Sequence, residues 1–256
     1  MDETAARGFA GAVAAYERGR PAYPEAAISC LVEALRLEPE GTVLDLAAGT
    51  GKLTRRLVGA GARVVAVEPV DEMRAVLEAA LPEVEALAGT AESIPLADGA
   101  VGAVTVGQAF HWFDGDRALA ELHRVLRPEG RLGLIWNWRD QDSELQAGLS
   151  ELIEPYRGET TSYSSGRWRE AFERTSLFTA LAVRSVPWVH ETTPDGVVDR
   201  FASVSFISTL SSEEKERLFE RIRALLGGRE RVELAYRTDV YWCERVDARR
   251  SSVVRP

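Results

Sequence analysis

The segment VLDLAAGTGKLT, from Val43 to Thr54, has the strongest pattern for chemistry in this chain of 256 residues. It is typical of a buried strand, a glycine-bearing turn and the start of a helix. Gly49 and Gly51 have no side chain to obstruct a ligand, and both tolerate positive φ, so the backbone can approach a ligand closely. The next strand ends in Glu68, whose carboxylate can accept hydrogen bonds from both hydroxyls of a ribose. Together these features predict a nucleoside-bearing cofactor.

The residues that this turn lacks narrow the choice of cofactor. A phosphate loop requires GxxxxGK followed by Ser or Thr, but Leu46 occupies the first Gly position and Leu53 follows Lys52. A dinucleotide fingerprint requires a third small residue, and Thr54 stands there, which disfavours NAD without excluding it. S-adenosylmethionine (SAM) has a ribose and no phosphate. An acid at the strand end, two glycines and Glu68 are sufficient for SAM.

Further candidate residues lie outside this turn. His111 follows a predicted strand, and a neutral imidazole beside a hydroxyl nucleophile can act as a general base. The alternative for His111 is a structural role in which its hydrogen bonds hold a loop. Tyr16 and Tyr23, in the opening segment YERGRPAYP, offer ring faces that suit a sulfonium cation, or they pack against the first helix. Arg20 is a candidate for binding the cofactor carboxylate, or it is a solvated surface charge.

The elements that must position these residues alternate between helix and strand from Pro24 onward, which predicts a parallel sheet. Runs such as RVVAV and RLGLIW are apolar throughout, as strands buried on both faces are. The strands expected are Thr42–Leu46, Arg63–Val67, Val84–Ala88, Val101–Val106 and Arg131–Trp136, and the helices expected are Glu25–Leu37, Lys52–Ala60, Asp71–Ala80 and Arg117–Val125. This order is typical of an α/β, Rossmann-like doubly wound fold.

After Asn137 the sequence becomes polar and Ser-rich, and its pattern predicts an inserted helical cap. Its expected helices are Leu145–Tyr156, Trp168–Glu173, Asp195–Phe206 and Ser212–Leu226. Strands at Ala182–Val189 and Val232–Val246 would complete a mostly parallel, seven-stranded sheet with one antiparallel edge strand. We therefore expect an N-terminal lid at 1–24, a Rossmann-like core at 25–139, a helical cap at 140–181 and 194–230, and closing strands at 182–193 and 231–248.

Composition excludes several classes of protein. Hydrophobic residues make up 45% of the chain and charged residues 28%, as in ordinary globular proteins. The net charge of -9 and the absence of a dense basic run argue against nucleic acid and anionic membranes as partners. Cys30 and Cys243 stand alone, so neither a disulfide nor a metal site is expected. No signal peptide or membrane span is recognisable, so we expect a cytoplasmic protein; its oligomeric state is left open.

Several motifs in chain order resemble those of class I SAM-dependent methyltransferases. DLAAGTG followed by AVEP resembles the first two motifs of that family. The segment from Gly89 to Asp114 resembles the third and fourth motifs, and the segment from Glu121 to Asn137 resembles the helix, turn and strand that follow. With YERGRPAYP, the first 140 residues or so are similar to the type 11 group, which contains ubiquinone-biosynthesis and trans-aconitate methyltransferases. Two departures are Ala47, in place of the first Gly of DxGxGxG, and Gly102, where an acid is often found.

The resemblance implies SAM as the cofactor and assigns a role to each matching residue. Asp45 would organise the loop, while Ala47 and Gly49 would offer backbone to the methionine moiety; Gly51 would belong to the same cofactor-binding loop. Glu68 would hold the ribose. The remaining residues that the resemblance and the opening segment place at the cofactor are Tyr16, Arg20, Pro69, Met73, Ala91, Glu92 and Gln108, of which Gln108 would lie beside the methyl group.

The expected reaction is direct in-line transfer of the methyl group to a small-molecule acceptor, with alignment as the main contribution of the protein. His111 and Gln108 are the candidate catalytic residues. The acceptor pocket would be formed by the insertion, with an aromatic lining of Trp138, Tyr163, Trp168 and Phe206. The alternative is a pocket in which Arg139, Arg167 and Arg169 recognise a carboxylate. O-, C- and amine N-methylation all stay open. The alternatives are a nicotinamide-dependent reductase and a non-catalytic SAM-binding protein of the same fold.

Overall fold

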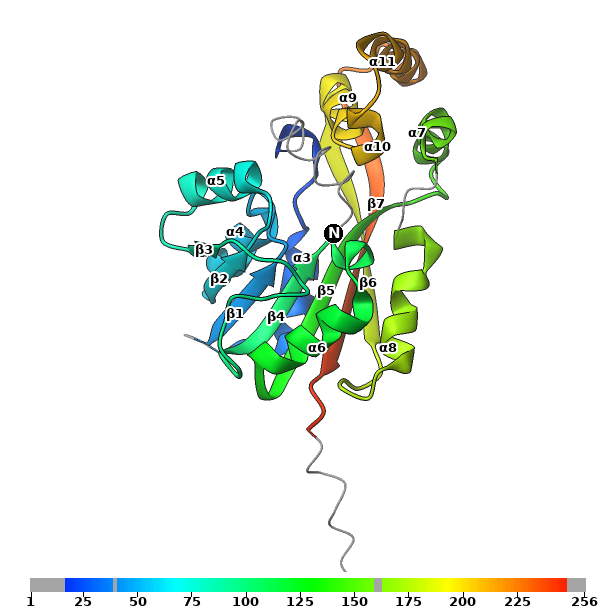
Figure 1. Ribbon diagram of the computed structural model, residues 1–256. Helices are drawn as coiled ribbons and strands as arrows, with labels where there is room; N and C mark the ends of the chain where they lie inside the picture. The colour runs from blue at the N-terminus through cyan, green and yellow to red at the C-terminus, as the bar shows by residue number, and fades with distance from the viewer. Residues whose placement is uncertain (1–16, 39–40, 159–162, 248–256) are drawn as a thin grey trace, which may run out of the picture.

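The computed structural model describes residues 17–38, 41–158 and 163–247, and these residues form one seven-stranded sheet with helices around it (Figure 1). The strand order is β3-β2-β1-β4-β5-β7-β6. The strands are β1 (Thr42–Leu46), β2 (Arg63–Val67), β3 (Glu85–Leu87), β4 (Val101–Gly107), β5 (Leu126–Arg139), β6 (Ala182–Thr192) and β7 (Val232–Glu244). The first five strands are parallel, whereas β7 pairs antiparallel with both β5 and β6. The predicted fold class is confirmed, and its antiparallel pairing lies at the β6 end of the sheet.

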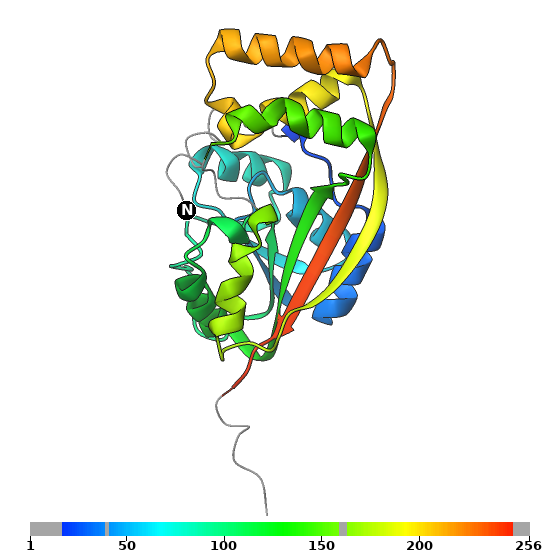
Figure 2. The ribbon, with the colours of Figure 1, turned by 90° about the vertical axis from the view of Figure 1, so that its right-hand side faces the viewer.

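Helices cover both faces of the sheet and the carboxyl ends of its strands. Those near the parallel strands are α3 (Glu25–Leu35), α4 (Lys52–Gly59), α5 (Asp71–Ala80) and α6 (Gly115–Val125). Those that follow β5 are α7 (Glu144–Ile153), α8 (Glu170–Arg174), α9 (Pro194–Ala202), α10 (Ser205–Ser208) and α11 (Ser212–Leu226). Four of these, α7, α9, α10 and α11, lie together beyond the carboxyl ends of the parallel strands, and the long strands β6 and β7 reach them (Figures 1 and 2).

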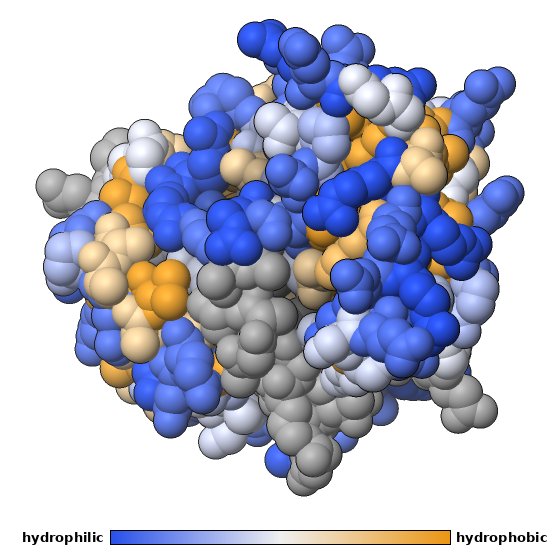
Figure 3. All heavy atoms as spheres, turned by 90° about the horizontal axis from the view of Figure 1, so that it is seen from above, coloured by the Kyte–Doolittle hydropathy of each residue, from blue (hydrophilic) through white to orange (hydrophobic). Residues whose placement is uncertain are grey.

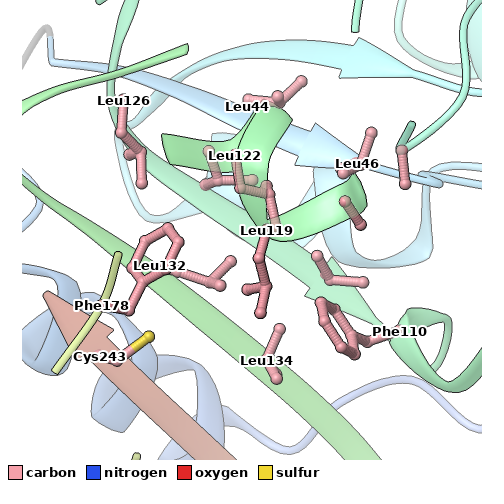
Figure 4. Packing of buried hydrophobic residues seen from close by; sticks show 14 of the residues in the cluster. Leu44, Leu46, Phe110, Leu119, Leu122, Leu126, Leu132, Leu134, Phe178 and Cys243 are labelled. Atoms are coloured by element: carbon pink, nitrogen blue, oxygen red, sulfur yellow. The ribbon is translucent and has the colours of Figure 1, made fainter. Parts of the chain in front are cut away.

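The alternation of side chains along β1 separates two hydrophobic layers. Val43 faces α3 and α4, where it packs in one buried cluster. Leu44 and Leu46 face the opposite side and join a second cluster with α6. Figure 4 shows Leu119 and Leu122 of α6 over these strands. Since both faces of the strands are covered, the buried residues of β1 are apolar, apart from the Asp45 carboxylate near its end.

The cap helices have a hydrophobic core of their own. Phe201 of α9 and Ile222 of α11 are buried in it, together with Leu234 and Tyr236 at the start of β7. Helix α11 begins with a capping box, in which Ser211 and Glu214 satisfy each other's backbone amides, and it ends at Gly227 in a left-handed conformation. Strand β7 therefore runs from the cap core into the core of the sheet.

The division into lid, core, cap and closing strands remains a proposal, and residues 1–16 of the expected lid lie outside the described residues. No helix in the described ranges is long and apolar enough to cross a membrane. The face over the carboxyl ends of the strands is mostly hydrophilic, with smaller apolar areas between charged side chains (Figure 3).

Candidate functional site

The loop between β1 and α4 has three residues in left-handed conformations. Ala47, Gly49 and Gly51 have φ values of 57°, 59° and 83°. Gly51 is the N-cap of α4, and a Cβ atom there would contact Leu77 and Leu81 at 3.1 and 3.3 Å. Ala47 adopts a conformation that glycine adopts most easily, and it does so where the family pattern has glycine. The left-handed conformation of Ala47 costs roughly 1–2 kcal/mol relative to glycine. The loop nevertheless keeps the shape that the family pattern has with glycine at this position.

The Asp45 side chain links this loop to α4 and β4 through hydrogen bonds. The side chain is buried and accepts hydrogen bonds from Thr54 Oγ1 of α4 at 2.7 Å and from Thr105 Oγ1 of β4 at 3.0 Å. Burial raises the pKa of Asp45 to about 6, although the two hydroxyl donors oppose that shift. The carboxylate thus joins α4 and β4 at the point where the strand order of the sheet reverses, which is where open α/β sheets bind ligands.

Glu68, directly after β2, also holds the loop, through a hydrogen bond to its Gly49 backbone. One of its carboxylate oxygens accepts the Gly49 backbone N–H at 2.8 Å, and the other accepts the Val70 N–H at 2.9 Å. The side chain is buried, which raises its pKa, while the two backbone N–H donors oppose the rise. A carboxylate has about four acceptor positions, so two remain for the hydroxyls of a ribose.

The residues assigned to the adenine follow β2 and β3 at the same edge of the sheet. Met73 on α5 and Ala91 after β3 are buried, whereas Pro69 is half-buried. The Glu92 carboxylate accepts the backbone N–H of Asp114 at 3.0 Å, so it also ties its loop to the start of α6. The structure places these four residues near one another, at the carboxyl ends of β2 and β3. Their contacts with an adenine ring remain a prediction.

Gln108 and His111 follow β4 on the neighbouring loop. Gln108 has a φ of 61°, and its backbone N–H donates to the Ile135 carbonyl at 2.9 Å. Non-glycine residues with positive φ are uncommon, and the surrounding structure must enforce the conformation at Gln108. The His111 ring lies 4.7 Å from the Trp112 ring, and its buried Nδ1 has no hydrogen-bond partner in the described chain. Burial, and secondarily the charge of Arg20, lower the pKa of His111 to about 4.

Only part of the opening segment can be placed, because Tyr16 lies outside the described residues. Arg20 donates to the hydroxyl and the carbonyl of Ser203 at the end of α9, both at 3.2 Å. Glu17 accepts hydrogen bonds from Thr50 Oγ1 at 2.6 Å and from Arg55 at 3.1 Å. The segment from residue 17 to 24 therefore connects the glycine loop to the cap.

Sequence reasoning missed several residues that border the mouth of this site. A small hollow of about 20 Å³ beside Gln108, room for about one water molecule, is lined by Pro21, Lys52, Asn137, Arg200 and Tyr236, together with Arg20 and Tyr23, which the sequence had already indicated. Asn137 was placed only at the end of a motif, yet it donates to the carbonyls of Pro21 and Ala22 and accepts from Thr238 Oγ1. Only its position at the carboxyl end of β5 signalled a role.

Of the aromatic residues expected to line the acceptor pocket, some pack in hydrophobic cores and one lines an open cleft. Trp168 is buried, and its ring lies 4.7 Å from the Trp136 ring and 5.9 Å from the Tyr163 ring, so it packs in the core of the sheet. Phe206 packs against the cap core. Trp138, in contrast, lines an open cleft between β5 and α7. The described residues contain no cluster of three or more His, Cys, Asp or Glu side chains that could hold a metal ion.

Comparisons with known proteins agree with this geometry. Residues 44–134 match the family model described as a methyltransferase domain. An uncharacterized methyltransferase of Mycobacterium tuberculosis is 46% identical over 222 residues, which cover 85% of each chain.

Two solved structures share the fold. A protein of Anaeromyxobacter dehalogenans proposed as a type II methyltransferase superposes with a TM-score of 0.66 at 23% identity, and the match covers 88% of this chain and 97% of the other. Phosphoethanolamine N-methyltransferase 2 of Haemonchus contortus, solved with phosphomonomethylethanolamine and S-adenosylhomocysteine, has a TM-score of 0.59 at 14% identity, covering 96% of this chain and 60% of the other.

Proposed function

Since the chain belongs to the class I SAM-dependent methyltransferases, we propose that it binds SAM at the β1–α4 loop and transfers the methyl group to a small-molecule acceptor. The observation that carries this proposal is the buried Glu68 carboxylate at 2.8 Å from the Gly49 N–H, at the carboxyl edge of a parallel sheet. The shape of the loop fits SAM, because three left-handed residues turn the chain directly after β1 and leave the backbone open to a ligand.

Each residue of the site has a distinct task in this proposal. Glu68 holds the ribose hydroxyls with its free acceptor positions, and Asp45 keeps the loop in register with β4. Gln108 borders the hollow where the acceptor enters. When bound, SAM supplies an electrophilic methyl group on a sulfonium. The protein aligns the acceptor and excludes water, and orientation of this kind can remove several kcal/mol from a barrier.

His111 is neutral near pH 7 because its pKa is about 4. Its unpartnered Nδ1 can accept a proton from a hydroxyl or carbon acid held nearby. The low pKa makes it a weak base, and the Arg20 charge contributes to that weakness. An acceptor that is already a free amine or a carboxylate needs no such base.

The direct test is isothermal titration of the purified chain with SAM, S-adenosylhomocysteine and NADH. We expect both sulfur compounds to bind and NADH to give no heat. Transfer from methyl-labelled SAM is then measured across hydroxyl, carbon-acid and amine acceptors, since the site leaves all three open. Binding of NADH without SAM would overturn the proposed cofactor. SAM binding with no turnover on any acceptor class would contradict the proposed transfer.

A further inference from the structure

Two half-buried arginines beside the site have buried guanidinium nitrogens that no counter-charge pairs with. Nη1 of Arg139, at the end of β5, and both Nε and Nη1 of Arg200, on α9, have no hydrogen-bond partner. Within the ranges that the structure describes, no acidic side chain forms an ion pair with either guanidinium within 4.0 Å. The Arg139 guanidinium lies over the ring of Phe201, 5.3 Å from its centroid. Burial, followed by the charge of Arg200, lowers the pKa of Arg139 to about 10.

The two arginines share their surroundings with a third donor. Tyr236 of β7 pairs directly with Arg139 of β5 in the sheet register, and its buried hydroxyl also has no partner. Arg200 and Tyr236 line the hollow beside Gln108. Arg139 instead lines the open cleft between β5 and α7, and it interacts electrostatically with Arg200 and Tyr236. The three groups, from three elements, are therefore neighbours, and each has an unused hydrogen-bond donor.

This arrangement differs from that of other arginines in the fold. Arg124 pairs with Glu121 and Asp98 at 2.8 and 2.9 Å. Asp199, the residue directly before Arg200, pairs with Arg18 rather than with its neighbour. A buried guanidinium without a carboxylate is costly to the fold, and such groups are normally paired or engaged by a ligand. Guanidinium groups match carboxylates and phosphates, to which they can donate two parallel hydrogen bonds.

We propose that Arg139, Arg200 and the Tyr236 hydroxyl bind an anionic group, a carboxylate or a phosphate, of the methyl acceptor. This inference rests on the proposed methyl transfer, because it takes the hollow beside Gln108, together with the cleft that Arg139 lines, as the acceptor site. Lys52 donates to the Glu17 carbonyl near the glycine loop, and Arg20 is held by Ser203 at the end of α9, so both already have partners and are not included in the anion site. The anion anchors one end of the acceptor, and the reacting atom then points toward Gln108.

The test measures anion binding separately from cofactor binding and from turnover. The protein saturated with S-adenosylhomocysteine is titrated with inorganic phosphate in one arm and with citrate in the other, followed by calorimetry and by the rise in Tm. Arg200→Gln, Arg139→Gln and Tyr236→Phe are compared with Arg174→Gln, an exposed arginine on α8. We expect the two arginine variants to weaken binding of the preferred anion at least tenfold, and Arg174→Gln to leave it within twofold. The arm that binds more tightly identifies carboxylate or phosphate.

Two further readouts decide between this role and others. The affinity for S-adenosylhomocysteine should stay within threefold in every variant; a tenfold loss would assign the arginines to the cofactor instead. Arg200→Met should keep or raise the Tm of the ligand-free protein, since it removes a buried unpaired charge, while it abolishes the rise in Tm caused by the anion. A lower Tm than that of Arg174→Gln would show a structural role. Equal anion binding in wild type and variants, or none in wild type, would overturn the inference. Failure of wild type to bind S-adenosylhomocysteine would instead refute the proposed function.

Discussion

At the residue scale, the site depends on carboxylates that serve the fold and the ligand together. Glu68 is buried, yet both of its oxygens accept backbone N–H groups of the loops it joins. Both oxygens of Asp45 accept side-chain hydroxyl groups, one from Thr54 and one from Thr105. A substitution at either position therefore changes the shape of the loop as well as the contacts offered to a ligand, and each prediction needs a control for folding.

The first prediction concerns Glu68→Ala, which removes the carboxylate assigned to the ribose. We expect the affinity for SAM to fall by roughly 1.5–3 kcal/mol, the scale of hydrogen bonds to a charged group. Isothermal titration measures the change, and Glu72→Ala on the exposed side of α5 is the matched control. Unchanged affinity in Glu68→Ala, with the control also unchanged, would remove Glu68 from the binding site.

The second prediction concerns the pH dependence that His111 contributes to stability. The folded-state pKa of about 4 lies below the usual 6.5, so in this range the unfolded chain binds a proton that the folded chain does not. The stability contributed by neutral His111 is therefore complete above pH 6.5 and is lost as the pH falls toward 4, by up to about 1.4 kcal/mol per pH unit.

His111→Asn should reduce this loss. Urea unfolding of both proteins at several values between pH 4.5 and 7.5 gives the difference directly. Other shifted groups, such as Asp45, remain in both proteins and cancel in the comparison. If the two stability curves run parallel across this range, the imidazole is not held neutral by its burial.

Sequence patterns indicated Asp45, Gly49 and Glu68, and offered Arg20 and Arg139 as candidate anion-binding residues, but they did not indicate Arg200 or Tyr236. Asp45, Gly49 and Glu68 lie within one short stretch, so spacing alone groups them. Arg200 and Tyr236 come from α9 and β7, and only the path of the long strands brings them together. No local pattern encodes such a meeting, because it depends on how the cap lies over the sheet.

At the element scale, the segment from residue 17 to 24 connects the glycine loop to α9. Arg18 pairs with Asp199 at 2.7 Å, although this pair is exposed and contributes little. Gly19 is more informative, since a Cβ atom at that position would overlap the backbone of Asp199 and Arg200. The close approach of two backbones therefore requires glycine at this point.

The third prediction follows from that contact. Gly19→Ala should detach the segment from α9 and increase hydrogen exchange at residues 17–24, while the sheet keeps its protection because its core begins later in the chain. SAM affinity should fall if the segment helps to close the site. Gly59→Ala is the control, since nothing lies within 4 Å of its added Cβ. Equal exchange of this segment in wild type and Gly19→Ala would contradict the contact.

The predicted bounds of helices and strands agree best with the structure where apolar periodicity was the signal used. The bounds of β1, β2, α5 and α11 agree with the apolar periodicity. Strand β5 begins at Leu126 and ends at Arg139, and is longer at both ends than the predicted Arg131–Trp136. At its carboxyl end, the polar residues Asn137 and Arg139 interrupt the apolar run yet pair with Thr238 and Tyr236 of β7. The expected helix Asp195–Phe206 is two helices, α9 and α10, and at the break the Ser203 hydroxyl donates to the Arg200 carbonyl. Side chains of this type compete with backbone hydrogen bonds of the helix.

At the scale of the whole molecule, the net charge of -9 contrasts with the cations at the mouth of the site. The overall field does not attract anions, so selectivity for an anionic acceptor must come from the local group of arginines. This group lies between the sheet and the cap, and its geometry is maintained only while the two are held together.

The last prediction tests whether cap and sheet unfold as one unit. Ile222 of α11 is buried in the cap core, which also contains Leu234 and Tyr236 of β7, and the same strand continues into the sheet through Val240 and Cys243. A strand shared by both cores couples their unfolding. Ile222→Ala should therefore lower the free energy of unfolding of the whole chain by about 2–5 kcal/mol.

The measurement is urea unfolding followed by far-ultraviolet circular dichroism and by tryptophan fluorescence. We expect the two probes to report one coincident transition, shifted to lower urea concentration in Ile222→Ala. Leu225→Ala is the matched control, because that leucine lies on the same helix but is 39% exposed, and its loss should shift the transition far less. Two separate transitions in Ile222→Ala, with the sheet unfolding as in wild type, would show that the cap unfolds independently. The arginines at the mouth would then be held together only while the cap is folded, and anion binding should disappear at the first transition.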